Sequence, residues 1–158
     1  MENNTIFVRS ASDSTIVVNT INPPVHRVWT KKGARYPFDR QTLVQVYYDP
    51  SVEALFREGR LVTDDEAFLI EVGLKEEGKP SEIIELTDDY KNRLIKLMPL
   101  AEVKATVQKL SKSQIDELVD YAITHYQILA MDRVDYFSKI SGKNVMEAVK
   151  NYKLSLEG

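Results

Sequence analysis

The segment Ser111–Tyr126 carries the clearest folding signal in the chain. Ser111 and Gln114 have the spacing of a capping box, in which each side chain bonds the backbone N–H of the other residue at a helix N-terminus. Apolar residues then recur at the three- and four-residue spacing of an amphipathic helix, at Ile115, Leu118, Val119, Ala122 and Ile123. We therefore predict a helix around which the C-terminal half packs. This signal concerns packing and carries no chemistry.

Composition and charge narrow the class of protein. The chain has 158 residues, 43% apolar and 28% charged, which is ordinary for a soluble globular protein of one domain or two small ones. Its formal net charge of -3 argues against a protein built wholly for nucleic acid. It has no cysteine, which excludes disulfides and thiolate metal sites.

No targeting or membrane segment is evident. The N-terminal residues lack the basic start and long apolar core of a signal peptide. No apolar run approaches the roughly 20 residues that a membrane span needs. We expect a cytoplasmic location in the cell that makes the protein, and no membrane contact.

Short β-branched segments predict strands in the N-terminal part of the chain. They are residues 5–9, 15–19, 25–31 and 34–38, separated by turn compositions. Lys32-Gly33 fits a tight turn between the last two segments, because glycine accepts a positive φ. We predict a small antiparallel β meander of three or four strands.

After residue 38, residues suited to cap helices indicate a change from strands to helices. Asp39 and Asp49 can each cap a helix, and Thr63 with Glu66 has the spacing of another capping box. From Thr87 onward, apolar stripes at helical spacing continue to the end of the chain, including a predicted helix over residues 128–140. The predicted fold class is α+β, with a small N-terminal antiparallel β meander followed by a mainly helical C-terminal part.

The charged segment 75–81, which contains Gly and Pro and no apolar residue, is the best candidate for a linker. We predict a first domain over residues 1–74, with the β meander and short helices, and a helical bundle over residues 82–158. Whether the two pack as one domain is left open.

A basic surface around the predicted 25–38 hairpin is the first candidate site. Residues 9–40 hold six Lys or Arg side chains against two Asp, and Arg27, Lys31, Lys32 and Arg35 flank the aromatic rings of Trp29 and Tyr36. Such a surface could meet phosphates and stack on bases. It could equally be a strand edge that uses cations to prevent unwanted pairing. We favour a solvated or protein-binding edge.

Tyr47 and Tyr48 form the second candidate site. Adjacent residues cannot both point into one core face of a helix, so we expect one ring to be presented to a partner or to the second half of the chain. The predicted interaction residues are therefore Arg27, Trp29, Lys31, Lys32, Arg35, Tyr36, Tyr47 and Tyr48.

Catalytic chemistry has little support in the sequence. There are two histidines, no cysteine nucleophile, no Gly-rich phosphate loop and no zinc-ligand spacing. Acidic pairs at Asp64-Asp65 and Asp88-Asp89 sit at predicted helix starts, where they favour the helix dipole. A helix-turn-helix among the last three helices is disfavoured because its would-be recognition helix has no net charge. We predict no catalytic, cofactor-binding or metal-binding residue.

Several local segments together resemble small uncharacterised proteins of tailed phages, of the kind that serve as head, neck or tail structural and assembly components. The resemblance spans about residues 5–100, and its segments are Lys31-Lys32-Gly33, Pro37-Phe38-Asp39, Tyr47–Pro50 and Phe56–Val62. It implies a non-enzymatic subunit that works in many copies through protein contacts, with incorporation in a virion.

Three hypotheses follow. The first is a structural or assembly protein that forms a homo-oligomer or docks on a larger particle through the sheet edge and the exposed aromatic residues. The alternative is a nucleic-acid-binding accessory or regulatory protein that uses the basic residues 27–35. A hydrolase or transferase with a carboxylate metal site is the residual hypothesis.

Overall fold

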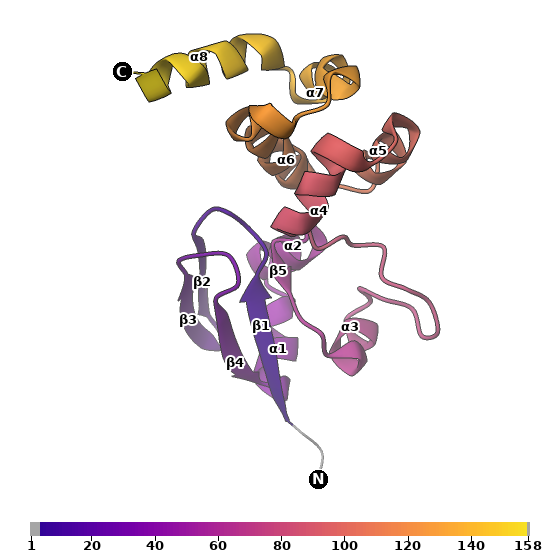
Figure 1. Ribbon diagram of the computed structural model, residues 1–158. Coiled ribbons are helices and arrows are strands. Elements are labelled where there is room, and N and C mark those ends of the chain that lie inside the picture. The colour runs from indigo at the N-terminus through magenta and orange to yellow at the C-terminus, as the bar shows by residue number, and fades with distance from the viewer. Residues whose placement is uncertain (1–3, 158) are drawn as a thin grey trace. The chain divides into compact units, whose positions relative to one another are not determined.

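The protein folds as two compact units (Figure 1). The computed structural model describes residues 4–157. The first unit ends at Glu85 and holds all the strands and α1–α3, while the second begins at Leu86 and holds α4–α8. The predicted α+β class is confirmed. The segment 75–81, predicted as a linker, lies within the first unit. Within residues 4–157, every helix falls short of the length and hydrophobicity that a membrane span requires.

The strands form two antiparallel sheets rather than one meander. The strands are β1 (Thr5–Ser10), β2 (Ile16–Ile21), β3 (Pro24–Trp29), β4 (Arg35–Asp39) and β5 (Leu61–Val62). One sheet has the order β4-β1-β5 and the other pairs β2 with β3. The predicted pairing of residues 25–31 with residues 34–38 is therefore wrong.

Local hydrogen bonds explain why β4 pairs with β1. The Gly33 N–H donates to the Ser10 carbonyl at 2.8 Å, and the Ser10 N–H donates to the Ala34 carbonyl at 2.9 Å. These bonds extend the ladder between β1 and β4 into the 32–34 turn. The partner of β3 is instead β2, and Thr20 stabilises their turn by donating to the Pro23 carbonyl and accepting from the Val25 N–H.

Three short helices complete the first unit, namely α1 (Arg40–Tyr47), α2 (Pro50–Arg57) and α3 (Glu66–Glu71). As predicted, Asp39 caps α1 and Asp49 caps α2. The predicted Thr63–Glu66 capping box is wrong, because Asp65 accepts the Phe68 N–H instead. Thr63 is two residues too early for the cap, and its hydroxyl donates to the Phe7 carbonyl of β1.

The second unit is helical. It contains α4 (Asp88–Asn92), a π-helical segment (Arg93–Leu97), α5 (Leu100–Val107), α6 (Lys112–Thr124), α7 (Val134–Ser141) and α8 (Val145–Glu157). Both bonds of the Ser111–Gln114 capping box are present, and the apolar stripe of α6 is buried at Leu118, Val119 and Ala122. The predicted 128–140 helix begins later, at Val134, after two short 3-10 turns.

The π-helical segment follows from contacts made far along the chain. The Arg133 guanidinium donates to the Leu94 carbonyl at 2.5 Å, and the Ala130 N–H donates to the Ile95 carbonyl at 2.8 Å. In an α-helix the Leu94 carbonyl would accept from the Met98 N–H, but that N–H bonds the Arg93 carbonyl at 2.7 Å, and Pro99 has no N–H to offer the Ile95 carbonyl. Arg133 and Ala130 supply the donors that these two carbonyls lack, which permits the wider helix. Arg133 is buried and its guanidinium bonds the Leu94 carbonyl, so it cannot contact DNA bases in a helix-turn-helix.

Asp65 gives a pH-dependent contribution to stability. Partial burial opposes ionisation of its carboxyl, but the hydrogen bonds from Arg40, at 2.6 Å, and from the Phe68 N–H outweigh this and lower its pKa below the usual 3.8. A carboxyl with a lowered pKa in the folded state stabilises the fold above its unfolded pKa. That stability is lost as the pH falls through the folded pKa.

We expect Asp65→Asn to lower the free energy of unfolding at pH 7 by about 1 kcal/mol, because asparagine keeps the capping acceptor but loses the charge facing Arg40. The deficit relative to wild type should shrink as the pH falls and vanish once the pH is below the lowered pKa of Asp65 in the folded state, because the wild-type side chain is then uncharged as well. Urea unfolding across this range measures it, with the exposed Asp135→Asn as control. A deficit independent of pH would contradict the electrostatic account.

Candidate functional site

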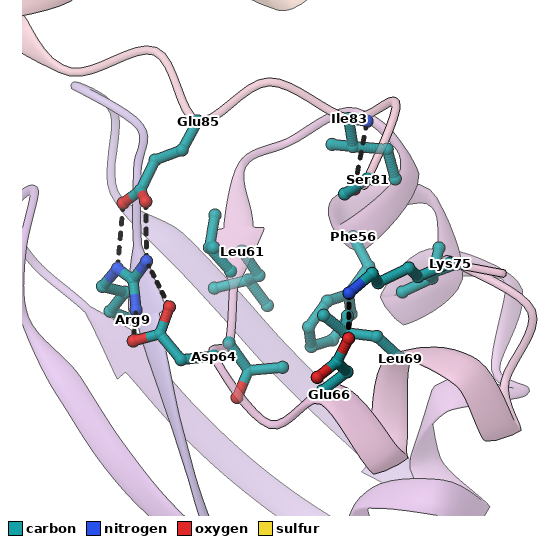
Figure 2. A pocket seen from close by; sticks show the side chains of 13 residues that line it. Arg9, Phe56, Leu61, Asp64, Glu66, Leu69, Lys75, Ser81, Ile83 and Glu85 are labelled. Atoms are coloured by element: carbon teal, nitrogen blue, oxygen red, sulfur yellow. Dashed lines mark hydrogen bonds and ion pairs between the residues drawn. The ribbon is translucent and has the colours of Figure 1, made fainter. Parts of the chain in front are cut away.

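A pocket of about 360 Å³ lies in the first unit (Figure 2). Its apolar wall is built by Phe56 of α2, Leu61 of β5 and Leu69 of α3. Its mouth is bordered by residues 75–85, here called the strap segment, which contains no helix or strand. Ile83 of the strap segment packs against the core of the unit. The pocket is therefore apolar inside and bordered by a long irregular segment.

One side of the pocket mouth is formed by an ion-pair cluster centred on Arg9 of β1. Its guanidinium donates to both Glu85 oxygens, at 2.9 and 2.6 Å, and to both Asp64 oxygens, at 2.8 and 3.1 Å. These carboxylates, Glu85 foremost, raise the pKa of Arg9 well above its usual value despite partial burial. Bidentate arginine–carboxylate pairs of this kind fix the relative orientation of the two side chains and also stabilise the contact. The Arg9 cluster thus ties the end of the strap segment to the sheet.

The other end of the strap segment is held by an ion pair between Lys75 and Glu66 of α3. The strap segment is therefore attached to the body of the unit at both ends. Lys75 and Glu66 lie across the pocket from the Arg9 cluster (Figure 2). The pocket is consequently bordered by ion pairs on two sides.

The structure corrects the prediction for Trp29. Its side chain is fully buried, its indole N–H donates to the Val8 carbonyl at 3.1 Å, and its ring stacks on Phe38 and meets Tyr36 edge-on. Trp29 therefore holds the core together and is not available as an interaction anchor. Tyr36 is half-buried and donates to the Val28 carbonyl at 2.9 Å, so its polar tip is also engaged.

The two adjacent tyrosines diverge as their helix position requires. Tyr47 is buried against Phe56 and Phe68, whereas the side chain of Tyr48 is 60% exposed. Prediction of Tyr47 as an interaction residue is therefore wrong. Burial raises the pKa of the Tyr47 hydroxyl, an effect that the nearby Arg57 guanidinium opposes. Tyr48 remains a candidate contact residue.

The predicted basic residues do not form one hairpin surface. Arg27 lies on β3, Arg35 on β4 and Lys31 and Lys32 in the turn between them, but β3 and β4 belong to different sheets. Lys32 pairs with Asp13 at 3.2 Å. The Arg27 and Arg35 guanidinium groups lie over the rings of Phe38 and Phe7 at 5.8 and 4.6 Å from the centroids. Lys31 and Arg35 are exposed.

The edge of β2 is a surface that the sequence did not single out. In residues 4–157, β3 is the only strand that pairs with β2. The opposite edge of β3 is partly covered, because the Tyr36 hydroxyl bonds the Val28 carbonyl. The outward face of β2 carries Val17 and Ile21, and the Ile21 side chain is 91% exposed. This strand therefore combines an unpaired edge with exposed apolar side chains.

The sequence also did not predict that Arg9, Asp64 and Glu85 lie together. The sequence indicates Arg9 only as one of the basic residues in 9–40, and Asp64 only as an acid at a predicted helix start. Their separations of 55 and 76 residues leave no local pattern to detect.

Among residues 4–157, no group of three or more His, Cys, Asp or Glu side chains is arranged to hold a metal ion. No protein-family model, curated protein or solved structure matches this chain.

Because Trp29 fills the core, we expect Trp29→Ala to lower the free energy of unfolding by about 3–5 kcal/mol. Trp29→Phe keeps most of the ring volume but removes the donor to Val8, so its cost should be intermediate. Tyr48→Ala should change stability by less than about 0.5 kcal/mol, as for an ordinary surface residue. Urea unfolding followed by circular dichroism measures all three. A Trp29→Ala variant as stable as wild type would contradict the core assignment.

Proposed function

We propose that this protein is a non-enzymatic structural or assembly subunit that works in multiple copies through protein contacts. The observation that carries the proposal is the edge of β2. An exposed strand edge offers unpaired backbone donors and acceptors to another chain, and apolar side chains beside it supply the anchors. The phage virion or virion-assembly role rests on the sequence resemblance alone.

The other edge strands have features that discourage pairing with another chain, and β2 does not. Proline and charged residues at a strand edge disfavour pairing with another strand, because proline has no N–H to donate and burying a charge is costly. Pro24 and Arg27 lie on β3, and Arg35 and Pro37 on β4, whereas β2 has the uncharged sequence IVVNTI. β5 has only two residues. This contrast favours β2 as the pairing edge.

A second copy of the chain is the partner that we propose for this edge. Antiparallel pairing of β2 with β2 of the second copy joins identical surfaces, which gives a closed twofold dimer with one continuous sheet across it. The residues of β2 carry no charge, so this contact should persist at high salt. Larger assemblies would then require a further surface, for which Tyr48 is exposed.

We expect light scattering to give twice the chain mass at both low and high salt. The double variant Val17→Lys/Ile21→Lys should be monomeric at the same concentration, with a dissociation constant raised by about 30- to 700-fold. This corresponds to the loss of roughly 2–4 kcal/mol of apolar burial. The double variant Met146→Lys/Leu154→Lys, which replaces exposed apolar residues on α8, is the matched control and should remain dimeric.

A monomeric wild-type protein at all concentrations, or a β2 double variant with the wild-type mass, would contradict the proposal. The same experiment tests the alternative function. If wild type is monomeric and co-elutes with nucleic acid at low salt only, the exposed Lys31 and Arg35 become the leading site, since phosphate contacts weaken steeply with salt.

A further inference from the structure

The pocket of Figure 2 is separate from the β2 edge and has no part in the proposed self-association. We infer that it is a docking site for a basic segment of a partner protein, one that inserts an apolar side chain between flanking lysines or arginines. Three features of the pocket carry this inference, namely its size and lining, the exposure of its charges, and the fixation of the strap segment.

The size and lining of the pocket define the inserted group. Its volume of about 360 Å³ is near the lower end of the range for ligand pockets, roughly 300–1,000 Å³. Phe56, Leu61 and Leu69 supply apolar surface inside. Such a space suits one or two aliphatic or aromatic side chains, whose burial would supply most of the affinity.

The charges at the mouth define what flanks that group. In the Arg9–Asp64 pair, the carboxylate side chain is 85% exposed and the guanidinium 27%. In the Glu66–Lys75 pair, the carboxylate is 62% exposed and the ammonium 17%. In both pairs the cation is sheltered and the carboxylate faces solvent. With Glu85 included, the pocket is lined by three carboxylates and two cations. An approaching chain therefore meets negative charge on both sides of the mouth.

The strap segment makes the site ready for binding. Its two ends are held by Glu66 and Arg9, and Ile83 is packed on the core. A border already fixed in this way has less freedom to lose when a partner docks, which lowers the entropic cost of binding. Ser81 of the strap segment lines the pocket and is exposed, so it marks a position where the mouth can be blocked from outside.

The test uses the full chain and three hexapeptides, with nitrogen-15 NMR titration as the measurement. The probe is acetyl-Gly-Lys-Leu-Leu-Lys-Gly-amide. In the second peptide glutamate replaces both lysines, and in the third serine replaces both leucines. We expect the probe to bind with a dissociation constant on the order of 1 mM and to shift the amide signals of Leu61, Leu69 and Ile83. The other two peptides should bind at least about fivefold more weakly.

Two substitutions test the mouth of the pocket. Ser81→Trp should block it and weaken probe binding by at least about tenfold, whereas Ser155→Trp on α8 should leave it unchanged. Asp64→Asn removes one exposed carboxylate and should weaken binding by about two- to fivefold, because single exposed charge pairs contribute little each. Asp135→Asn on α7, which also removes one exposed negative charge, is its control.

Three results would overturn the inference. They are the absence of shifts at Leu61, Leu69 and Ile83 with the lysine–leucine probe at tenfold its expected dissociation constant, equal binding of the glutamate peptide, and wild-type binding by a correctly folded Ser81→Trp variant. None of these results bears on dimer formation through β2, so failure of the docking site and failure of the proposed function are distinguishable.

Discussion

The first unit depends on the position of one indole ring. Trp29 is on β3, yet its N–H bonds the carbonyl of Val8 on β1 and its ring stacks on Phe38 of β4. The two sheets share no strand pairing, so this contact joins them through a side chain. A buried carbonyl left without a donor would be costly, which makes the hydrogen bond as restrictive as the packing. The β2 edge and the pocket are both presented by the body that this residue holds together.

The sequence predicted well those features that depend on contacts between residues only a few positions apart. Asp39, Asp49 and Ser111 cap the helices that follow them because a cap needs only a side-chain oxygen and an N–H two or three positions later. Strand existence was also predictable from β-branched composition. The pairing of β1 with β4 was not, because the choice between partners is made by the core and by the turn at Gly33.

The candidate site was less predictable for the same reason. Nothing near Arg9 in the sequence indicates that its charge is matched by Asp64 and Glu85, and Trp29 gave the wrong prediction because an aromatic residue suits a core as well as an interface. The pair Tyr47-Tyr48 shows an intermediate case. Helical geometry required the two rings to diverge, but only the positions of Phe56 and Phe68 determine which one is buried.

The π-helical segment Arg93–Leu97 has a consequence for the order of folding. Its carbonyls at Leu94 and Ile95 take their donors from Arg133 and Ala130, which are more than thirty residues away. Closing so long a loop is slow compared with forming a turn of helix. The cap and hydrogen bonds of α6 are local, whereas the π-helical segment also needs contacts from residues 130–133. We therefore expect the π-helical segment to reach its final geometry after α6 has formed.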